Sequence, residues 1–163
     1  MGARVTAVDY SEDALRFTRR NTNDLAEDYL AADLRDSDFA NTLRDRFDLV
    51  FSDGLFEHFT PTEQDDILVN FITMIKPNGI IATFVPNLYH PRVLVQPIIM
   101  PGIREKPFTR RRLLDFYRRN GLRVIESGGV NCVPIEPSPD RVLGAWFGMI
   151  IYVIGKAVKM EKI

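Results

Sequence analysis

The chain has 163 residues, of which 45% are hydrophobic and 26% carry charge. This length favours one domain, residues 1–163, and these proportions exclude a disordered or fibrous chain. The formal net charge of −1 leaves no overall basic field to attract nucleic acid or anionic lipid. A single cysteine, Cys132, excludes an internal disulfide and cannot by itself build a zinc cage. The start of the chain shows no signal-like apolar segment, so we expect a cytoplasmic protein without a metal site.

The first part of the chain predicts strands that alternate with helices. Residues 5–8 are β-branched or apolar, as in a strand, and Ser11 can then cap a helix whose last turn is basic. Residues 29–32 and 47–51 are the next two strand candidates, and an acid follows each of them closely. This order predicts a strand–helix–strand unit at the start of the domain.

The most clearly marked helix comes next. Thr60, Pro61 and Glu63 form the capping-box pattern with proline at the first helical position, and apolar residues then recur at helical spacing. Residues 76–79 predict a turn, and residues 80–85 are a continuous apolar run typical of a strand buried on both faces of a parallel sheet. Strands that alternate with helices in this way predict an α/β fold.

Residues 86–108 differ in composition from the rest of the chain. They contain five prolines, so we expect no regular element there. Their many apolar side chains would form either an adhesive exposed surface or a lid over a binding site. We expect a substrate lid, which would suit an apolar or lipid-like acceptor, although simple packing on the sheet explains the composition equally well.

The last part of the chain predicts one helix and two strands. A helix that Thr109 caps and Gly121 ends comes first, followed by a strand over residues 122–126 and a loop over residues 130–140. Residues 142–155 are apolar but fewer than the ~20 that a membrane-spanning helix needs, so we interpret them as the last core strand with its lead-in. Parallel neighbours need a long crossover, usually helical, so we expect this last strand to be antiparallel.

Candidate ligand-binding residues follow the predicted strands, because an open α/β sheet binds ligands at the carboxyl ends of its strands. Asp9 and Asp33 end the first two predicted strands, and Gly54 follows the third. An acid in this place can accept hydrogen bonds from both hydroxyls of a ribose. Alternatively, Asp9 only begins the turn, with its carboxylate bonded to a nearby amide.

These segments resemble the class I S-adenosylmethionine-dependent methyltransferases of the small-molecule type. The resemblance lies in the order and spacing of residues 3–11, 32–34, 47–59 and 75–80. It implies a Rossmann-like, mostly parallel sheet with an antiparallel last strand. It also implies S-adenosylmethionine as cofactor and methyl transfer to a small-molecule acceptor.

The resemblance further implies roles by position for six residues. Asp9 would bind the ribose hydroxyls, Tyr10 would pack on the adenine, and Asp33 would accept from the adenine amino group. Asp33 can instead be a solvated acid ahead of Arg35. The expected cofactor-binding residues are Asp9, Tyr10, Asp33, Leu34, Ser52 and Gly54, with Leu34 acting through its backbone amide.

Methyl transfer needs a base only when the nucleophile holds a proton of high pKa, because alignment with the sulfonium methyl supplies much of the rate. Glu57 and His58, just beyond the third strand, are weak candidates for this base. A structural role in their loop is the favoured interpretation. Tyr89 and His90 are candidates for acceptor binding, with an exposed loop histidine as the alternative for His90.

Two arginine groups raise the question of a nucleic-acid partner. Residues 110–112 and 118–119 are basic, but their helical spacing favours a solvated helix face over a phosphate-binding patch. We therefore expect a small-molecule acceptor, with neither nucleic acid nor a membrane span.

The family's glycine-rich turn between its first strand and first helix is not in this sequence, where Gly2 is the one glycine before Gly54. The resemblance therefore implies an N-terminally truncated domain that lacks the first strand and has two unpaired strand edges. Three explanations stay open: a complete enzyme whose recorded start lies downstream, an inactive remnant that acts as a binding or structural partner, and a homo-oligomer that completes the sheet. A fourth explanation, an NAD-dependent oxidoreductase in which Asp9 would bind the ribose of the nicotinamide cofactor, ranks below these.

Overall fold

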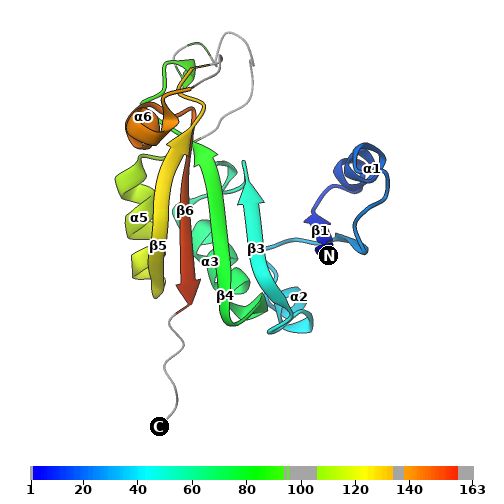
Figure 1. Ribbon diagram of the computed structural model, residues 1–163. Helices are drawn as coiled ribbons and strands as arrows, with labels where there is room; N and C mark the ends of the chain where they lie inside the picture. Colours follow the sequence, from blue (N-terminus) through cyan, green and yellow to red (C-terminus); the bar gives the residue numbers. More distant parts are fainter. Residues whose placement is uncertain (1, 94, 96–105, 134–137, 158–163) are drawn as a thin grey trace.

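The structure, a computed structural model, describes residues 2–93, 95, 106–133 and 138–157. Its strands form two separate sheets (Figure 1). The smaller sheet pairs β1 (Thr6–Asp9) with β2 (Asp28–Ala31) in parallel, and α1 (Glu12–Asn21) connects the two strands. These three elements are the strand–helix–strand unit that the sequence predicts.

The larger sheet has four strands in the order β3–β4–β6–β5. Its strands are β3 (Phe47–Asp53), β4 (Ile75–Pro86), β5 (Leu122–Val130) and β6 (Ile150–Ala157). β3 and β4 are parallel, whereas β6 is antiparallel to both of its neighbours. The expected α/β fold with an antiparallel last strand is therefore confirmed.

The helices of the larger unit are α2 (Ser37–Thr42), α3 (Pro61–Met74), α5 (Arg110–Arg119) and α6 (Asp140–Phe147), with a 3-10 turn η1 (Phe56–His58) before α3. The predicted caps are present: the Ser11, Thr60 and Thr109 side chains each accept a backbone N–H in the first turn of their helix. Figure 1 shows α3 and α5 behind the sheet, and no helix among the described residues in front of it.

The main hydrophobic core lies between α3, α5, η1 and the sheet. Phe56 and Phe116 are fully buried there, with their ring centroids 5.2 Å apart in an edge-to-face arrangement. Further buried members come from every layer: Ile67, Leu68, Phe71, Ile75, Ile81, Val85, Phe108, Leu113, Tyr117, Leu122, Ile151 and Val153. On the sheet's other face Phe51, Phe84 and Tyr152 lie ring against ring, and Phe51 is exposed.

Of the edge strands of the two sheets, β1 and β3 are the two between which the missing strand was expected. Within the described residues, β1 pairs only with β2 and β3 pairs only with β4. The expectation of two unpaired edges is therefore confirmed. One of the links between the two regions is an ion pair from Arg46, just before β3, to Asp28 in β2, with 2.6 Å between Nη2 and Oδ2.

Three expectations about local structure were wrong. Residues 76–79 lie within β4 rather than in a separate turn, and they form an irregular stretch of that strand, where the register of the pairing with β3 shifts and Asn78 takes a positive φ. Residues 140–147 form the helix α6, where we expected the lead-in of a strand, and β6 begins only at Ile150. Residues 92, 93 and 95 are helical, and the rest of the expected lid, residue 94 and residues 96–105, lies outside the described residues.

No helix in the described part of the chain has the length and apolar character needed to cross a bilayer.

Candidate active site

Asp9 is the last residue of β1, and its side chain shapes the turn into α1. Its Oδ1 accepts the backbone N–H of Ser11 at 2.7 Å, which is the simpler role that the sequence analysis left open. No hydrogen bond to Oδ2 occurs within the described residues. The neighbouring Tyr10 is largely exposed. One carboxylate oxygen and one aromatic ring are therefore available at the carboxyl end of β1.

Asp33 lies two residues beyond β2 and is paired with Arg35. Its carboxylate accepts the backbone N–H of Arg35 at 2.9 Å, and Arg35 Nη2 lies 2.7 Å from Oδ2. These bonds from Arg35 hold the pKa of Asp33 below its usual value. Arg35 also forms an ion pair with Glu63 at the start of α3, with 2.6 Å between Nη1 and Oε1. Asp33 is thus one end of a charged network that leads to α3.

Leu34, between these two charged residues, packs partly into the core. Its carbonyl oxygen accepts a hydrogen bond from Asn70 Nδ2 of α3 at 2.9 Å. This bond fixes the backbone that the resemblance assigns to adenine binding.

Ser52 and Gly54 lie at the end of β3, in different surroundings. The Ser52 hydroxyl is buried 3.4 Å from Thr83 Oγ1, which also accepts from the Tyr117 hydroxyl at 2.7 Å. Burial raises the pKa of Tyr117 above its ordinary value. Gly54 has φ +67°, and its N–H donates to the Phe84 carbonyl at 3.1 Å. The structure thus turns the Ser52 side chain into the core and leaves the Gly54 backbone at the sheet's carboxyl end.

Glu57 and His58 are neighbours in η1, but their environments are opposite. The Glu57 side chain is buried, with only 2% of the residue exposed, whereas His58 is exposed. The structure therefore does not bring the two together as an acid–base pair.

This turn is held in place by Gln64, which the sequence analysis did not single out, and by Arg112, which it assigned to a solvated helix face but which is half-buried. Gln64 Nε2 of α3 donates to the Phe56 carbonyl at 2.7 Å and to the Phe59 carbonyl at 3.0 Å. Arg112 of α5 in turn donates to Gln64 Oε1 at 3.1 Å. The one signal in the sequence is a glutamine among the core positions of the α3 pattern, next to the capping box. This support favours the structural interpretation of the turn.

Tyr89 and His90 follow the carboxyl end of β4, and His90 lines a small pocket there. The Tyr89 ring is exposed, and its N–H donates to Asn87 Oδ1 at 3.1 Å. His90 Nδ1 accepts the backbone N–H of Arg92 at 3.1 Å, so the neutral ring carries its proton on Nε2. The pocket has a volume of about 70 Å³ and is lined by Pro86, Asn87, His90, Arg92, Val93, Met149 and Ile150.

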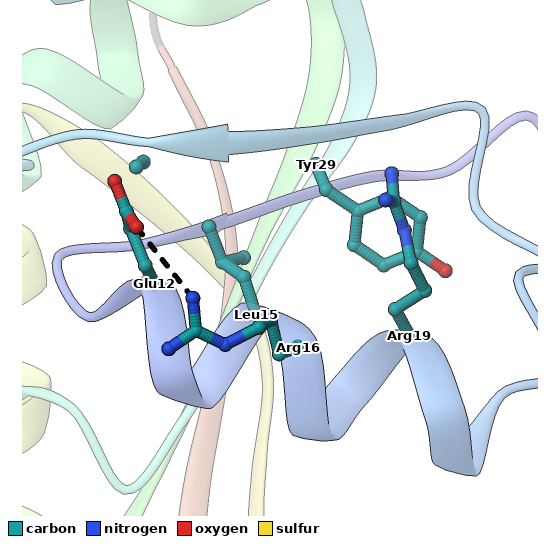
Figure 2. A pocket seen from close by; sticks show the side chains of 6 residues that line it. Glu12, Leu15, Arg16, Arg19 and Tyr29 are labelled. Carbon is teal, nitrogen blue, oxygen red and sulfur yellow. Dashed lines mark ion pairs between the residues drawn. The ribbon is translucent and has the colours of Figure 1, made fainter.

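A larger pocket of about 250 Å³ lies between α1 and β2 (Figure 2). Glu12 and Arg16 form an ion pair in its wall, with 3.7 Å between Oε2 and Nη1. The Arg19 guanidinium lies 4.5 Å from the centre of the Tyr29 ring. None of the expected site residues lines this pocket, and its charged groups already have partners.

The described residues contain no group of side chains that could hold a metal ion. They do fit part of S-adenosylmethionine: Asp9 offers a carboxylate oxygen, Tyr10 a ring, and Gly54 a backbone that can approach a ligand closely. Among the described residues, however, no strand lies between β1 and β3 that could bring backbone N–H groups to the cofactor. The donors and acceptors present therefore fit the nucleoside side of the cofactor better than its methionine side.

Comparison with known proteins agrees with this geometry. Residues 1–79 match a family model described as a methyltransferase domain. No curated protein matches the chain. Among solved structures, the complex of the Trm112 methyltransferase activator with a methyltransferase from Haloferax volcanii contains a chain that is 20% identical, with a TM-score of 0.71. The alignment covers 97% of this chain and 73% of that one.

Two further structures have the same fold. A SAM-dependent methyltransferase from Archaeoglobus fulgidus is 18% identical with a TM-score of 0.65, and the match covers 93% of this chain and 75% of that one. The 1,6-didemethyltoxoflavin-N1-methyltransferase of Burkholderia thailandensis is also 18% identical, with a TM-score of 0.63 and coverage of 96% and 62%. The chain therefore has the fold of the class I S-adenosylmethionine-dependent methyltransferases. The resemblance seen in the sequence is confirmed, with S-adenosylmethionine as the cofactor of the class.

Proposed function

We propose that this protein transfers a methyl group from S-adenosylmethionine to a small-molecule acceptor at the carboxyl ends of β1, β3 and β4. The observation that carries the proposal is Asp9 at the end of β1, with Oδ1 in the turn to α1 and Oδ2 open to a ligand. The bound 1,6-didemethyltoxoflavin and S-adenosylhomocysteine of the Burkholderia thailandensis enzyme support a small-molecule acceptor by analogy of fold. A cytoplasmic location stays a prediction.

In this proposal the chain's own residues bind and orient the cofactor. Asp9 accepts the ribose hydroxyls, Tyr10 packs on the adenine, and Gly54 allows close approach at the end of β3. Asp33 accepts from the adenine amino group in place of one of its bonds from Arg35, because the Arg35 donors reach both of its carboxylate oxygens. When bound, the cofactor supplies an electrophilic sulfonium methyl group, so alignment of the acceptor does much of the catalytic work.

Acceptor binding falls to the segment that follows β4. With Nδ1 of His90 engaged by the Arg92 N–H, the neutral ring presents an N–H donor at Nε2 rather than a base. We therefore assign His90 to holding an acceptor oxygen, with the exposed Tyr89 ring beside it, and Glu57 to the support of its own turn.

The cofactor site also needs one more parallel strand, placed between β1 and β3. Both open edges belong to strands whose existing partners are parallel, so an added parallel strand would continue both ladders. A glycine turn after that strand would bring backbone N–H groups to the methionine side. The alternative, an inactive protein that uses its open edges to bind a partner, predicts no cofactor binding even when the sheet is complete.

Calorimetry with S-adenosylmethionine tests the proposal. We expect residues 1–163 to bind weakly or not at all, and a version that carries the additional strand, glycine turn and helix to bind. Tight binding by residues 1–163 would overturn the need for the extra strand. Failure of the completed version to bind would overturn the cofactor assignment and favour the inactive partner, and binding of NADH instead would favour an oxidoreductase.

A carboxylate variant tests the central contact in the completed version. Asp9→Asn should weaken S-adenosylmethionine binding about tenfold or more, because an amide accepts hydroxyl hydrogen bonds less strongly than a charged carboxylate. Asp13→Asn, an exposed acid on the neighbouring helix α1, serves as the matched control and should bind as the parent does. Equal affinity for Asp9→Asn and the parent would remove Asp9 from the site.

A further inference from the structure

The helix α6 is oriented with its small residues inward and its large apolar residues outward. Gly144 is buried, whereas Val142, Leu143, Trp146 and Phe147 are 77%, 41%, 68% and 55% exposed. An amphipathic helix on a globular protein normally packs its apolar stripe against the core. We call these four exposed side chains the α6 apolar face.

This orientation is held by backbone contact and leaves no room for the helix to roll. A Cβ added at Gly144 would lie 2.0 Å from the Gly129 carbonyl oxygen in β5, and one added at Gly129 would lie equally close to the Gly144 oxygen. At the other end of the helix, Asn87 Nδ2 donates to the carbonyls of Trp146 and Gly148 at 3.0 and 2.9 Å. Rotation of α6 to bury Trp146 would place an indole where a methyl group does not fit.

The α6 apolar face lies at the end of the sheet where β4 finishes (Figure 1). Leu88 and Tyr89, also exposed, directly follow Asn87, whose amide contacts α6. Two basic side chains, Arg92 and Arg141, are exposed in the same region and form no ion pair with any described residue. Aromatic and aliphatic groups therefore occur together with unpaired cations at one end of the molecule.

We propose that the α6 apolar face docks on the surface of an anionic lipid bilayer. A helix of eight residues is about 12 Å long, too short to supply the ~800 Å² per partner of a stable protein dimer. It is also convex, whereas small ligands and peptides need a pocket, a groove or a sheet edge. A bilayer needs no such fit, because tryptophan and phenylalanine enter its interface while arginine contacts anionic headgroups.

This docking would bring the end of β4 toward the membrane. If the proposed methyl transfer holds, on which this step alone rests, the acceptor is an apolar molecule that reaches the His90 pocket from the bilayer. The docking itself requires no cofactor, so the experiment below is done without one, and its outcome is independent of methyl transfer.

The chain provides its own reporter, because Trp146 is its single tryptophan. Residues 1–163 are titrated with vesicles of phosphatidylcholine alone and with vesicles containing about one third phosphatidylserine. We expect a blue shift of the Trp146 emission and co-sedimentation, stronger with phosphatidylserine and weaker in high salt. Lipids that carry a quencher in the acyl chain should quench the Trp146 emission, more strongly with phosphatidylserine and less in high salt.

Matched variants separate the α6 apolar face from general hydrophobicity. Val142→Ser with Phe147→Ser keeps Trp146 and should weaken vesicle binding about tenfold or more, as expected for the loss of two apolar side chains at an interface. Val69→Ser with Phe17→Ser changes the same residue types at exposed positions on α3 and α1, and should bind as the parent does. All four positions are exposed, so both variants should fold.

Three results would overturn the proposal. The first is an unchanged Trp146 emission together with no co-sedimentation at any lipid concentration. The second is equal binding by the two double variants. The third is a blue shift that follows protein concentration in the absence of vesicles, which would assign the α6 apolar face to a second copy of the chain.

Discussion

The β1–α1–β2 unit and the four-stranded sheet differ most in how well they are packed. In the smaller unit Leu15 is the one large apolar side chain among the described residues that is buried, and all four residues of β1 are half-buried. In the larger unit a continuous core joins α3, α5, η1 and three strands. Two-stranded sheets are at best marginally stable alone. We therefore expect local unfolding of the smaller unit to cost less free energy than unfolding of the larger unit.

This difference bears on the proposed function, because the smaller unit holds the candidate cofactor-binding residues Asp9 and Tyr10. The arrangement of two of the six candidate cofactor-binding residues therefore depends on what covers the open edges of β1 and β3. The exposed Leu49 and Phe51 of β3 lead to the same conclusion, since a central strand of a parallel sheet is normally covered on both faces.

The largest expected effect is the difference in stability lost when one buried side chain is truncated in each of the two units. Phe56→Ala should lower the free energy of unfolding by about 3–5 kcal/mol, because it empties a fully buried site between two aromatic rings. Leu15→Ala should cost clearly less than the ~2–5 kcal/mol usual for a buried leucine, because its surroundings are half-exposed. Urea titration followed by circular dichroism measures both, and equal costs would contradict the proposed difference in packing.

Two helix-cap variants, one in each unit, form a matched pair with an expected effect on stability of intermediate size. Thr60→Ala removes the hydroxyl that accepts the Glu63 N–H, leaves the backbone half of the α3 capping box, and should lower global stability by about 1 kcal/mol. Ser11→Ala removes the α1 cap and should instead speed amide exchange in α1, with little change in the global transition. If Ser11→Ala shifts the urea midpoint as much as Thr60→Ala does, the two regions unfold as one.

The smallest effect concerns Glu63, which ties the segment after β2 to α3 through Arg35. Hydrogen bonds from the Thr60 backbone and hydroxyl and from Arg35 lower the pKa of Glu63 from 4.5 to about 2. A lowered pKa in the folded state means that this stabilisation is present above pH 4.5 and is lost as the pH falls toward 2.

Glu63→Gln should therefore be less stable than the parent at pH 7, and the difference should shrink between about pH 4.5 and pH 2 in thermal melts. Glu12→Gln, which removes an exposed ion pair with Arg16, is the matched control and should show little difference at any pH. A difference for Glu63→Gln that stays constant across this range would exclude the carboxylate as its cause.

Much of the fold and part of the candidate site could be predicted from the sequence. The caps at Ser11, Thr60 and Thr109 were predictable because each bond joins groups three residues apart, within one turn of helix. The positions of Asp9 and Gly54 at strand ends followed from the hydrophobic pattern. The antiparallel last strand followed from the absence of a long crossover before it.

The tertiary structure decided the rest, because it depends on contacts between distant parts of the chain. Gln64 and Arg112 support the turn of Glu57 across 48 residues of sequence, and no local pattern shows that bond. The sequence analysis took α6 for the lead-in of a strand. The contact of Gly144 with the backbone of Gly129 in β5 sets the orientation of this helix, and that contact joins residues far apart in the sequence. By itself the sequence determined the class of fold and the residues at its strand ends. Tertiary packing decided which side chains are buried, which are paired, and which face outward, because only folding brings distant backbone into contact.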